Sequence, residues 1–450
     1  MGQQVSTLET TADQTLALLR AGQLAGTRRL NLTAGLTTFP EEILGLADSL
    51  EVLDLSHNAL TTLPDRFAQL QNLRIAFFNN NAFEVVPEVL AQCPRLSMIG
   101  FKANQITTVP AGSLPPATRW LILTDNRIET LPDSIGHMAR LQKLMLAGNR
   151  LRALPETMAA CHHLELIRIA ANQLDGLPPW LLTLPRLSWL AYAGNPFCKA
   201  FGPTPSVALP QIPWADLTVG DVLGQGASGV IHQGSWRQNE AKTPVALKLF
   251  KGAMTSDGLP LDEMRACIAA GAHPHLIGPS GQIIDHPEQK KGLVLPLVPP
   301  TYTVMGGPPS LESCTRDTYP PETAFARDVA LGIATGVAAA AAHLHQRGML
   351  HGDLYPHNTL VNPAGAAYLS DFGAASFYDP AEPSGAALER LEVRAFGCLL
   401  EDLGDRIAAP PDDRLRQLQQ ACLQPDVLAR PGFKEVLAVL TALAPAERSA

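Results

Sequence analysis

The chain has 450 residues and a formal net charge of −8, and 46% of its residues are hydrophobic. This length and composition favour two globular domains, each with a core of its own. The acidic balance argues against a nucleic-acid surface, and the apolar runs look shorter than the roughly 18 residues of a membrane span. The seven cysteines follow no metal-ligand spacing, so we expect reduced thiols in a cytoplasmic protein.

Asparagines recur every 22 or 23 residues in the first part of the chain. They are Asn58, Asn81, Asn104, Asn126, Asn149, Asn172 and Asn195. Apolar residues recur eight, five and three places before the asparagines, as in Leu50, Leu53 and Leu55, and a proline stands six places after each of the first six. This pattern resembles the leucine-rich repeat, which implies a solenoid with one short strand per repeat over residues 30–199. Each asparagine amide is expected to satisfy the backbone where the chain leaves a strand.

Both ends of this array differ from its middle. Residues 30–39 read as a degenerate first repeat without the asparagine, and residues 10–24 read as a short amphipathic helix. Because a terminal repeat must hide its edge from water, we expect the region 1–29 to cap the array. A proline-rich stretch over 200–214 has no periodicity and is predicted to link the array to a second domain, residues 215–446.

Large apolar side chains are predicted on the concave side of the array. Side chains alternate along a strand, so the residues six and four places before each asparagine should face that side. Phe77, Trp120, Ile122 and Met145 occupy such positions. A contiguous apolar patch is rarely left uncovered, so we expect it to dock a protein partner or substrate, or to be covered by another part of the chain.

The second domain begins with a glycine-rich loop. It comprises Gly224, Gln225, Gly226, Ala227, Ser228, Gly229 and Val230. Glycines without Cβ atoms allow backbone N–H groups to close over phosphates, although this pattern alone also fits an ordinary turn. Residues 243–249 then alternate like a strand and resemble the Val-Ala-Ile-Lys pattern of protein kinases. The resemblance implies that Lys248 contacts ATP phosphates and that Ala246 lines the nucleotide site.

Lys248 needs an acidic partner, which protein kinases supply from the next helix. Glu263 is the best candidate, and its neighbour Asp262 is the alternative. Residues 293–298 then resemble the hinge that binds adenine. There the carbonyl of Pro296 and the N–H of Val298 are the expected contacts, because proline lacks only its N–H.

Residues 351–358 and the later Asp371-Phe372-Gly373 carry the chemistry of the second domain. Phosphoryl transfer needs a carboxylate to take the acceptor's proton and oxygen ligands to hold Mg²⁺ against the phosphates. Asp353 suits the first task, and Asn358 and Asp371 suit the second. Order and spacing resemble the protein kinase catalytic loop and its metal-binding tripeptide.

Two later segments extend the resemblance. Glu392 stands where a buried helix anchors the catalytic loop, in place of the usual aspartate. Arg430 resembles the arginine near the end of the large lobe, and we expect it to pair with Glu389.

Three features depart from the family. Gly352 stands where many kinases have arginine, and Tyr355 replaces the lysine that usually neutralises the transferring phosphate. Only a short segment separates Gly373 from Glu392, which leaves little room for an activation segment or a peptide-docking platform. These departures put the substrate in question more than the ATP site.

The sequence therefore resembles a bacterial leucine-rich-repeat protein kinase, in which an α/β solenoid precedes an α+β bilobal kinase fold. The resemblance implies ATP and Mg²⁺ as cofactors and transfer to a serine or threonine hydroxyl of a protein. A small-molecule kinase would explain the missing platform, and a pseudokinase scaffold would explain Tyr355. Against the scaffold, Lys248, Asp353, Asn358 and Asp371 are all retained.

Overall fold

The computed structural model describes residues 11–200, 209–239, 241–252, 254–408 and 412–443. By its internal contacts the chain divides into two compact units. The first comprises Met1–Leu144 and Asn149–Cys161, and the second comprises Met145–Gly148 and His162–Ala450. In this division the last repeats group with the residues that follow them, and the domain boundaries expected from the sequence stay predictions.

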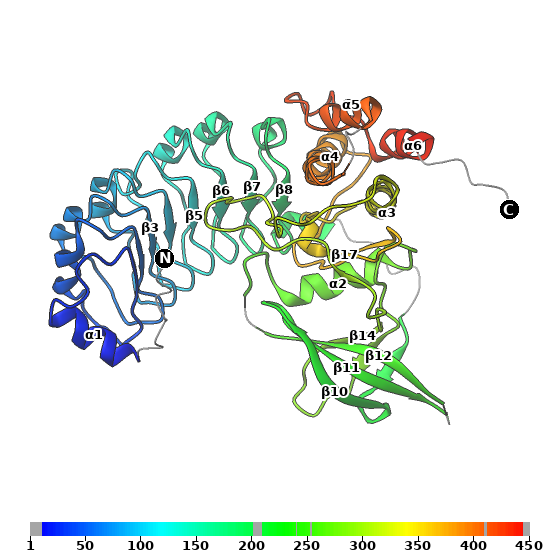
Figure 1. Ribbon diagram of the computed structural model, residues 1–450, viewed down its shortest axis with the longest axis horizontal. Coiled ribbons are helices and arrows are strands. Elements are labelled where there is room, and N and C mark those ends of the chain that lie inside the picture. Colours follow the sequence, from blue (N-terminus) through cyan, green and yellow to red (C-terminus); the bar gives the residue numbers. More distant parts are fainter. Residues whose placement is uncertain (1–10, 201–208, 240, 253, 409–411, 444–450) are drawn as a thin grey trace. The chain divides into compact units, whose positions relative to one another are not determined.

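The first unit is an array of short parallel strands that follows an N-terminal helix, α1 (Ala12–Arg20) (Figure 1). Thr11 caps α1 by accepting a hydrogen bond from the N–H of Gln14, and the Gln14 side-chain oxygen in turn accepts the Thr11 N–H. The strands are β1 (Arg29–Asn31), β2 (Val52–Asp54), β3 (Ile75–Phe77), β4 (Met98–Gly100) and β5 (Trp120–Ile122), and β6 (Lys143–Met145) lies at the division between the units. Neighbouring strands from β1 to β5 pair in parallel, in chain order.

Short 3₁₀ helices connect the strands of the repeats. They are η1 (Glu41–Leu46), η2 (Asp65–Gln69), η3 (Glu88–Gln92), η4 (Asp133–His137) and η5 (Glu156–Ala160). Each begins directly after a proline, because the ring presets the backbone torsion that the helix start requires. Four of the regularly spaced prolines, Pro64, Pro87, Pro132 and Pro155, are among these starts, whereas a turn follows Pro110.

The repeat asparagines bond the backbone, as predicted. The Asn126 amide nitrogen donates to the carbonyls of Phe101 at 2.9 Å and Leu123 at 3.0 Å. Its amide oxygen accepts the N–H of Ile106 at 2.9 Å. One side chain therefore joins consecutive repeats where each strand ends.

The second unit contains the last two repeat strands and a small lobe. The repeat elements are β7 (Leu166–Arg168), η6 (Pro179–Thr183), β8 (Trp189–Ala191) and η7 (Pro196–Ala200). The small-lobe elements are β9 (Gln211–Pro213), η8 (Trp214–Asp216), β10 (Leu217–Gln225), β11 (Gly229–Gln238), β12 (Ala241–Phe250), α2 (Pro260–Ala270), β13 (Gly281–Ile284) and β14 (Gly292–Pro296). Most of the predicted linker, residues 201–208, lies outside the described residues, and its end forms β9.

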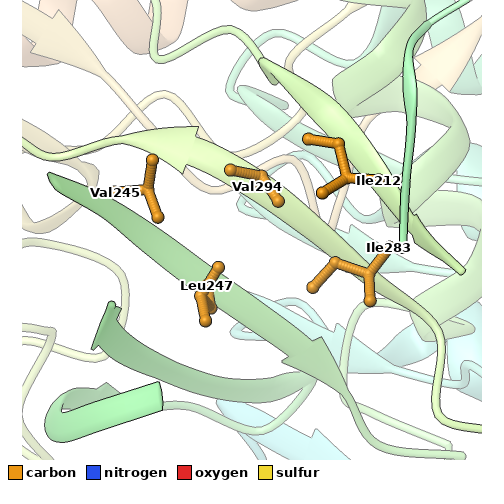
Figure 2. Packing of buried hydrophobic residues seen from close by; sticks show 5 residues of the cluster. All are labelled: Ile212, Val245, Leu247, Ile283 and Val294. Carbon is orange, nitrogen blue, oxygen red and sulfur yellow. The ribbon is translucent and has the colours of Figure 1, made fainter. Parts of the chain in front are cut away.

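The small-lobe strands form one six-stranded sheet in the order β10-β11-β12-β14-β13-β9. Its core is a cluster of buried aliphatic side chains: Ile212, Val245, Leu247, Ile283 and Val294 (Figure 2). Because alternate residues of β12 enter this core, the intervening residues point to the other face, where Ala246 and Lys248 lie. The core thus determines which face of the sheet carries Ala246 and Lys248.

The large lobe is mostly helical. Its elements are β15 (Thr303–Val304), α3 (Arg327–Gln346), β16 (Met349–Leu350), η9 (Pro356–Asn358), β17 (Thr359–Val361), β18 (Ala367–Leu369), β19 (Ser376–Phe377), α4 (Pro383–Gly404), α5 (Asp413–Cys422) and α6 (Phe433–Leu443). Helix α3 packs against α4, α6 and β18. By length and composition α3 could cross a membrane, so the expectation from the sequence that no segment is apolar enough to do so was too strict. However, 61% of its most apolar 18-residue stretch is buried inside the fold, as is usual for the core helix of a globular domain.

Candidate active site

An ion pair joins the small-lobe sheet to helix α2. The ammonium of Lys248 on β12 bonds the carboxylate of Glu263, and both side chains are largely buried. Burial alone would lower the pKa of Lys248, but Glu263 and Asp371 outweigh it and raise that pKa, which keeps the amine charged. Asp262 points elsewhere and pairs with Arg265 at 3.0 Å. Of the two acids proposed from the sequence, Glu263 is the one that meets the lysine.

The catalytic loop is anchored on helix α4. Glu392 accepts the Gly352 N–H at 2.7 Å through one oxygen and pairs with His345 at 2.7 Å through the other. His351, fully buried, bonds the carbonyl of Ser370 at 3.0 Å, and its ring packs on Phe372 at a centroid distance of 5.4 Å. Glu392 therefore lies where the sequence predicts the loop anchor, and His351 joins the loop to the segment Asp371-Phe372-Gly373.

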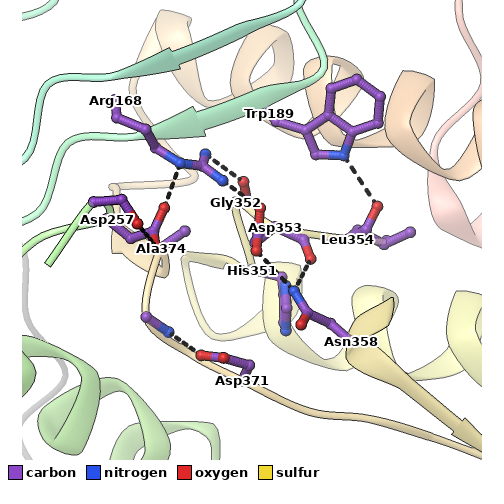
Figure 3. Close-up of polar contacts among 12 residues, drawn as sticks. Arg168, Trp189, Asp257, His351, Gly352, Asp353, Leu354, Asn358, Asp371 and Ala374 are labelled. Carbon is purple, nitrogen blue, oxygen red and sulfur yellow. Dashed lines mark hydrogen bonds and ion pairs between the residues drawn. The ribbon is translucent and has the colours of Figure 1, made fainter. Parts of the chain in front are cut away.

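Asp353 and Asn358 meet within the loop, as Figure 3 shows. The Asn358 amide nitrogen donates to the backbone carbonyl of Asp353 at 3.0 Å and to its carboxylate at 2.7 Å. These bonds orient the amide oxygen of Asn358 away from Asp353. Burial raises the pKa of Asp353, and the guanidinium of Arg168 opposes that rise.

Asp371 is exposed and has a left-handed backbone, with φ of 64°. Such a torsion is uncommon outside glycine and often marks a functional position. One carboxylate oxygen accepts the Gly373 N–H at 3.0 Å, which leaves the other oxygen for a ligand. Among the described residues no three His, Cys, Asp or Glu side chains form a metal cluster. A site of one carboxylate and one amide fits Mg²⁺, which usually takes its other ligands from phosphates and water.

The glycine-rich loop joins β10 to β11. The Gly226 N–H bonds the Gly229 carbonyl at 3.0 Å and closes the turn. A Cβ at Gly229 would lie 2.6 Å from the Leu249 carbonyl oxygen, so sheet pairing requires glycine there. Cβ atoms at Gly224 and Gly226 would meet nothing within 4 Å, so these two glycines leave open space, as a phosphate cradle needs.

The other predicted nucleotide contacts surround this loop. Gln225 and Ala227 are exposed, whereas Ser228 and Val230 are half-buried. Ala246, 7% exposed, pairs with Leu295 in the neighbouring strand. In the hinge, Pro296 ends β14 and is exposed, and Val298 is half-buried. These positions agree with a nucleotide site between the lobes, and their individual contacts with ATP stay predictions.

The sequence analysis missed several residues that line the site. Arg168 on β7 bonds Asp257 and the catalytic loop, and Trp189 on β8 covers the same loop (Figure 3). One signal for Arg168 was available: it lies four places before the repeat asparagine, on the predicted concave side, where most other repeats carry an apolar residue.

The expected pair between Glu389 and Arg430 does not form. Glu389 accepts the Tyr378 hydroxyl at 2.8 Å. Arg430 instead donates to the backbone carbonyls of Gln424, Arg390 and Pro185. Because these carbonyls already use all three guanidinium nitrogens, the arginine has no need of a carboxylate.

The residues predicted to face the concave side differ in exposure. Phe77, Trp120 and Ile122 are half-buried, and Met145 is 9% exposed. The Lys143 ammonium lies 4.2 Å from the centroid of the Trp120 ring. The docking role of these residues stays a prediction.

Comparison with protein families gives matches in both the N-terminal and the C-terminal part of the chain. Residues 217–391 match the family described as protein tyrosine and serine/threonine kinase. Residues 49–70 and 116–174 match two leucine-rich-repeat families. The chain thus combines leucine-rich repeats with a protein kinase domain.

Two curated relatives are similar to part of the chain. "Putative cyclin-dependent kinase F-2" of Oryza sativa subsp. japonica is 30% identical over 154 residues, which cover 34% of this chain and 44% of the relative. "Serine/threonine-protein kinase PkaB" of Streptomyces coelicolor is 27% identical over 173 residues, 36% of this chain and 37% of the relative. The chain therefore spans less than half the length of either relative.

Proposed function

We propose that this protein transfers the γ-phosphoryl group of Mg-ATP to a serine or threonine hydroxyl of a protein. The observation that carries the proposal is the joint geometry of Lys248 with Glu263 and of Asp353 with Asn358. The first pair joins a small-lobe strand to helix α2, and the second pair lies within the catalytic loop. Both the kinase family match and the similarity to PkaB support transfer to a protein hydroxyl.

Each residue has a definable task in this reaction. The charged amine of Lys248, held by Glu263, would bind nucleotide phosphates. The Asp353 carboxylate would accept the proton of the attacking hydroxyl, and the bond from Asn358 orients it. Asn358 and Asp371 would hold Mg²⁺ through their oxygens. The metal, when bound, neutralises charge that develops on the phosphates.

The repeats would recruit the protein acceptor through the concave residues Phe77, Trp120, Ile122 and Met145. We propose a cytoplasmic site of action, in keeping with scattered cysteines that form no disulfide within the described residues. A bacterial origin, expected from the sequence, is in line with the resemblance to a Streptomyces kinase.

The test is to incubate the full-length protein with γ-labelled Mg-ATP and generic protein acceptors. Wild type should label a protein acceptor, itself included, on serine or threonine. Asp353→Asn should lower transfer by a factor of about 10² or more while ATP binding is kept, because the base acts mainly in the transition state. Equal labelling by both proteins would refute the assignment of Asp353, and label found on tyrosine would refute the proposed specificity.

A further inference from the structure

An arginine on the next-to-last repeat strand contacts both lobes of the catalytic domain. Arg168, at the end of β7, has a side chain only 2% exposed. Its Nε donates to Asp257 at 2.6 Å and its Nη1 donates to the Gly352 carbonyl at 3.0 Å, while its Nη2 bonds the Asp353 carboxylate (Figure 3). One guanidinium therefore uses all three nitrogens on the catalytic domain, a role for which its planar fork is suited.

The first of these contacts holds the entrance to helix α2. Asp257 lies in the turn between β12 and α2, and this turn rests on the repeats. A Cβ at Gly258 would lie 3.1 Å from the Ala170 side chain, and a Cβ at Gly194 would lie 2.9 Å from the Asp262 carboxylate. The last repeats therefore pack against the start of the helix that presents the carboxylate partner of the strand lysine.

The second contact of Arg168 is with the catalytic loop, and the repeats also pack closely against this loop. Gly352 has φ of 73°, and a Cβ there would lie 2.4 Å from the Ala374 carbonyl oxygen and 2.7 Å from that of Leu190. Leu190 belongs to β8, so the repeat backbone occupies the space that a larger side chain would need. This accounts for glycine at a position where many kinases have arginine.

Contact with the repeats also accounts for the tyrosine at position 355, where many kinases have lysine. Its ring stacks on Trp189 of β8 with a centroid distance of 4.3 Å and an interplanar angle of 7°. The Trp189 indole N–H donates to the Leu354 carbonyl at 3.1 Å, and both aromatic rings are buried. The aromatic residue at the usual lysine position is thus a packing surface for the repeats.

The repeats also contact the short segment that follows Gly373, through Tyr192 directly after β8. The Tyr192 N–H donates to the Ser376 hydroxyl at 3.1 Å, and the Tyr192 hydroxyl donates to the Phe377 carbonyl at 3.2 Å. Helix α4 then begins at Pro383, so this segment has little structure of its own. The repeats therefore add side-chain and backbone contacts to the pairing of this segment with β16.

We infer that the last two repeats, residues 162–195, are a built-in positioning element of the catalytic site and that Arg168 is its central positioning residue. This inference rests on the proposed kinase function. Arg168 orients the Asp353 carboxylate and, through Asp257, holds helix α2 toward the catalytic loop. A carboxylate has about four acceptor positions, and Arg168 and Asn358 occupy two, so Asp353 keeps capacity for the substrate hydroxyl.

The first experiment measures steady-state kinetics on full-length variants. Arg168→Met should lower kcat about ten- to a hundredfold with little change in KM for ATP, since a misplaced catalytic group costs that much in rate. Arg168→Lys should restore part of the loss, because it keeps the charge without the fork. Arg150→Met, which removes an exposed arginine from another repeat, is the matched control and should match wild type. An increase in kcat for Arg168→Met would mean that the arginine blocks Asp353, and would overturn the inference.

Hydrogen exchange of the same proteins provides a readout that does not depend on turnover. Arg168→Met should speed amide exchange both in α2 and in residues 351–358, whereas Asp257→Asn should do so mainly in α2. Unchanged exchange in both segments would overturn the positioning role. If wild type itself transfers no phosphoryl group, the proposed function fails, and the exchange data still decide whether Arg168 positions the site.

Discussion

Asp353 and Asp371 are both carboxylates of one site, but their surroundings suit them to different tasks. Asp353 is largely buried, and its two oxygens accept hydrogen bonds from Arg168 and Asn358. Asp371 is exposed and has one oxygen engaged by its own turn. The first arrangement orients a proton acceptor, and the second leaves an oxygen for a hard cation.

At the residue scale, we expect Asp371→Ala to weaken nucleotide binding only when magnesium is present. Loss of one of the two proposed protein ligands should reduce magnesium-dependent ATP affinity at least about tenfold. Calorimetric titration with ATP, with Mg²⁺ and then with EDTA, measures this difference. Asp353→Asn is the matched carboxylate control and should bind Mg-ATP like wild type. Equal magnesium-dependent affinity in wild type and Asp371→Ala would rule out Asp371 as a metal ligand.

At the scale of elements, the loop after α2 joins this helix to α3 through histidines. The His273 Nδ1 accepts the His275 N–H at 3.2 Å, and the His273 ring lies 4.7 Å from that of His343 on α3. Burial, followed by the neighbouring His343 and His275, lowers the pKa of His273 from 6.5 to about 4. The folded loop therefore favours neutral His273.

This pKa shift predicts acid sensitivity of the catalytic domain. As pH falls from 6.5 toward 4, the unfolded chain takes up a proton at His273 before the folded chain does. The stability that comes from neutral His273 is therefore fully present above pH 6.5 and is lost progressively over this window. Melting temperatures at pH 7 and pH 5 should therefore differ less in His273→Gln than in wild type. His162→Gln, at an exposed position, should behave like wild type. An identical decline in wild type and His273→Gln would contradict the prediction.

The elements that could be predicted from the sequence are those whose signal lies within one short segment or one repeating pattern. The repeat strands follow from a period of 22 or 23 residues, and the catalytic loop from the types of residue that phosphoryl transfer requires. Glu263 could be separated from Asp262 only by the register of α2 in the fold. Arg168 could not be assigned, because its bond to Asp353 joins residues 185 positions apart.

At the scale of the whole molecule, we propose two roles for the repeats, one for the last two strands and one for the middle of the array. The last repeats bond the catalytic domain, whereas the concave row that contains Trp120 is proposed to bind a protein. Trp120→Glu should cost about 2 kcal/mol or more of partner affinity, because a central aromatic often dominates such contacts. Affinity capture with wild-type, Trp120→Glu and Arg150→Met baits tests this. Partners retained equally by all three would show that Trp120 does not contribute.

The bonds made by β7 and β8 also limit how this gene can evolve. Adjacent strands lie about 4.8 Å apart, so inserting or deleting one repeat after Asn172 would move Arg168 a full strand spacing from Asp353, beyond hydrogen-bonding reach. Repeats can be gained or lost only nearer the N-terminus. We therefore expect the segment from residue 162 onward to be inherited as one block, with array length varying among descendants only before it.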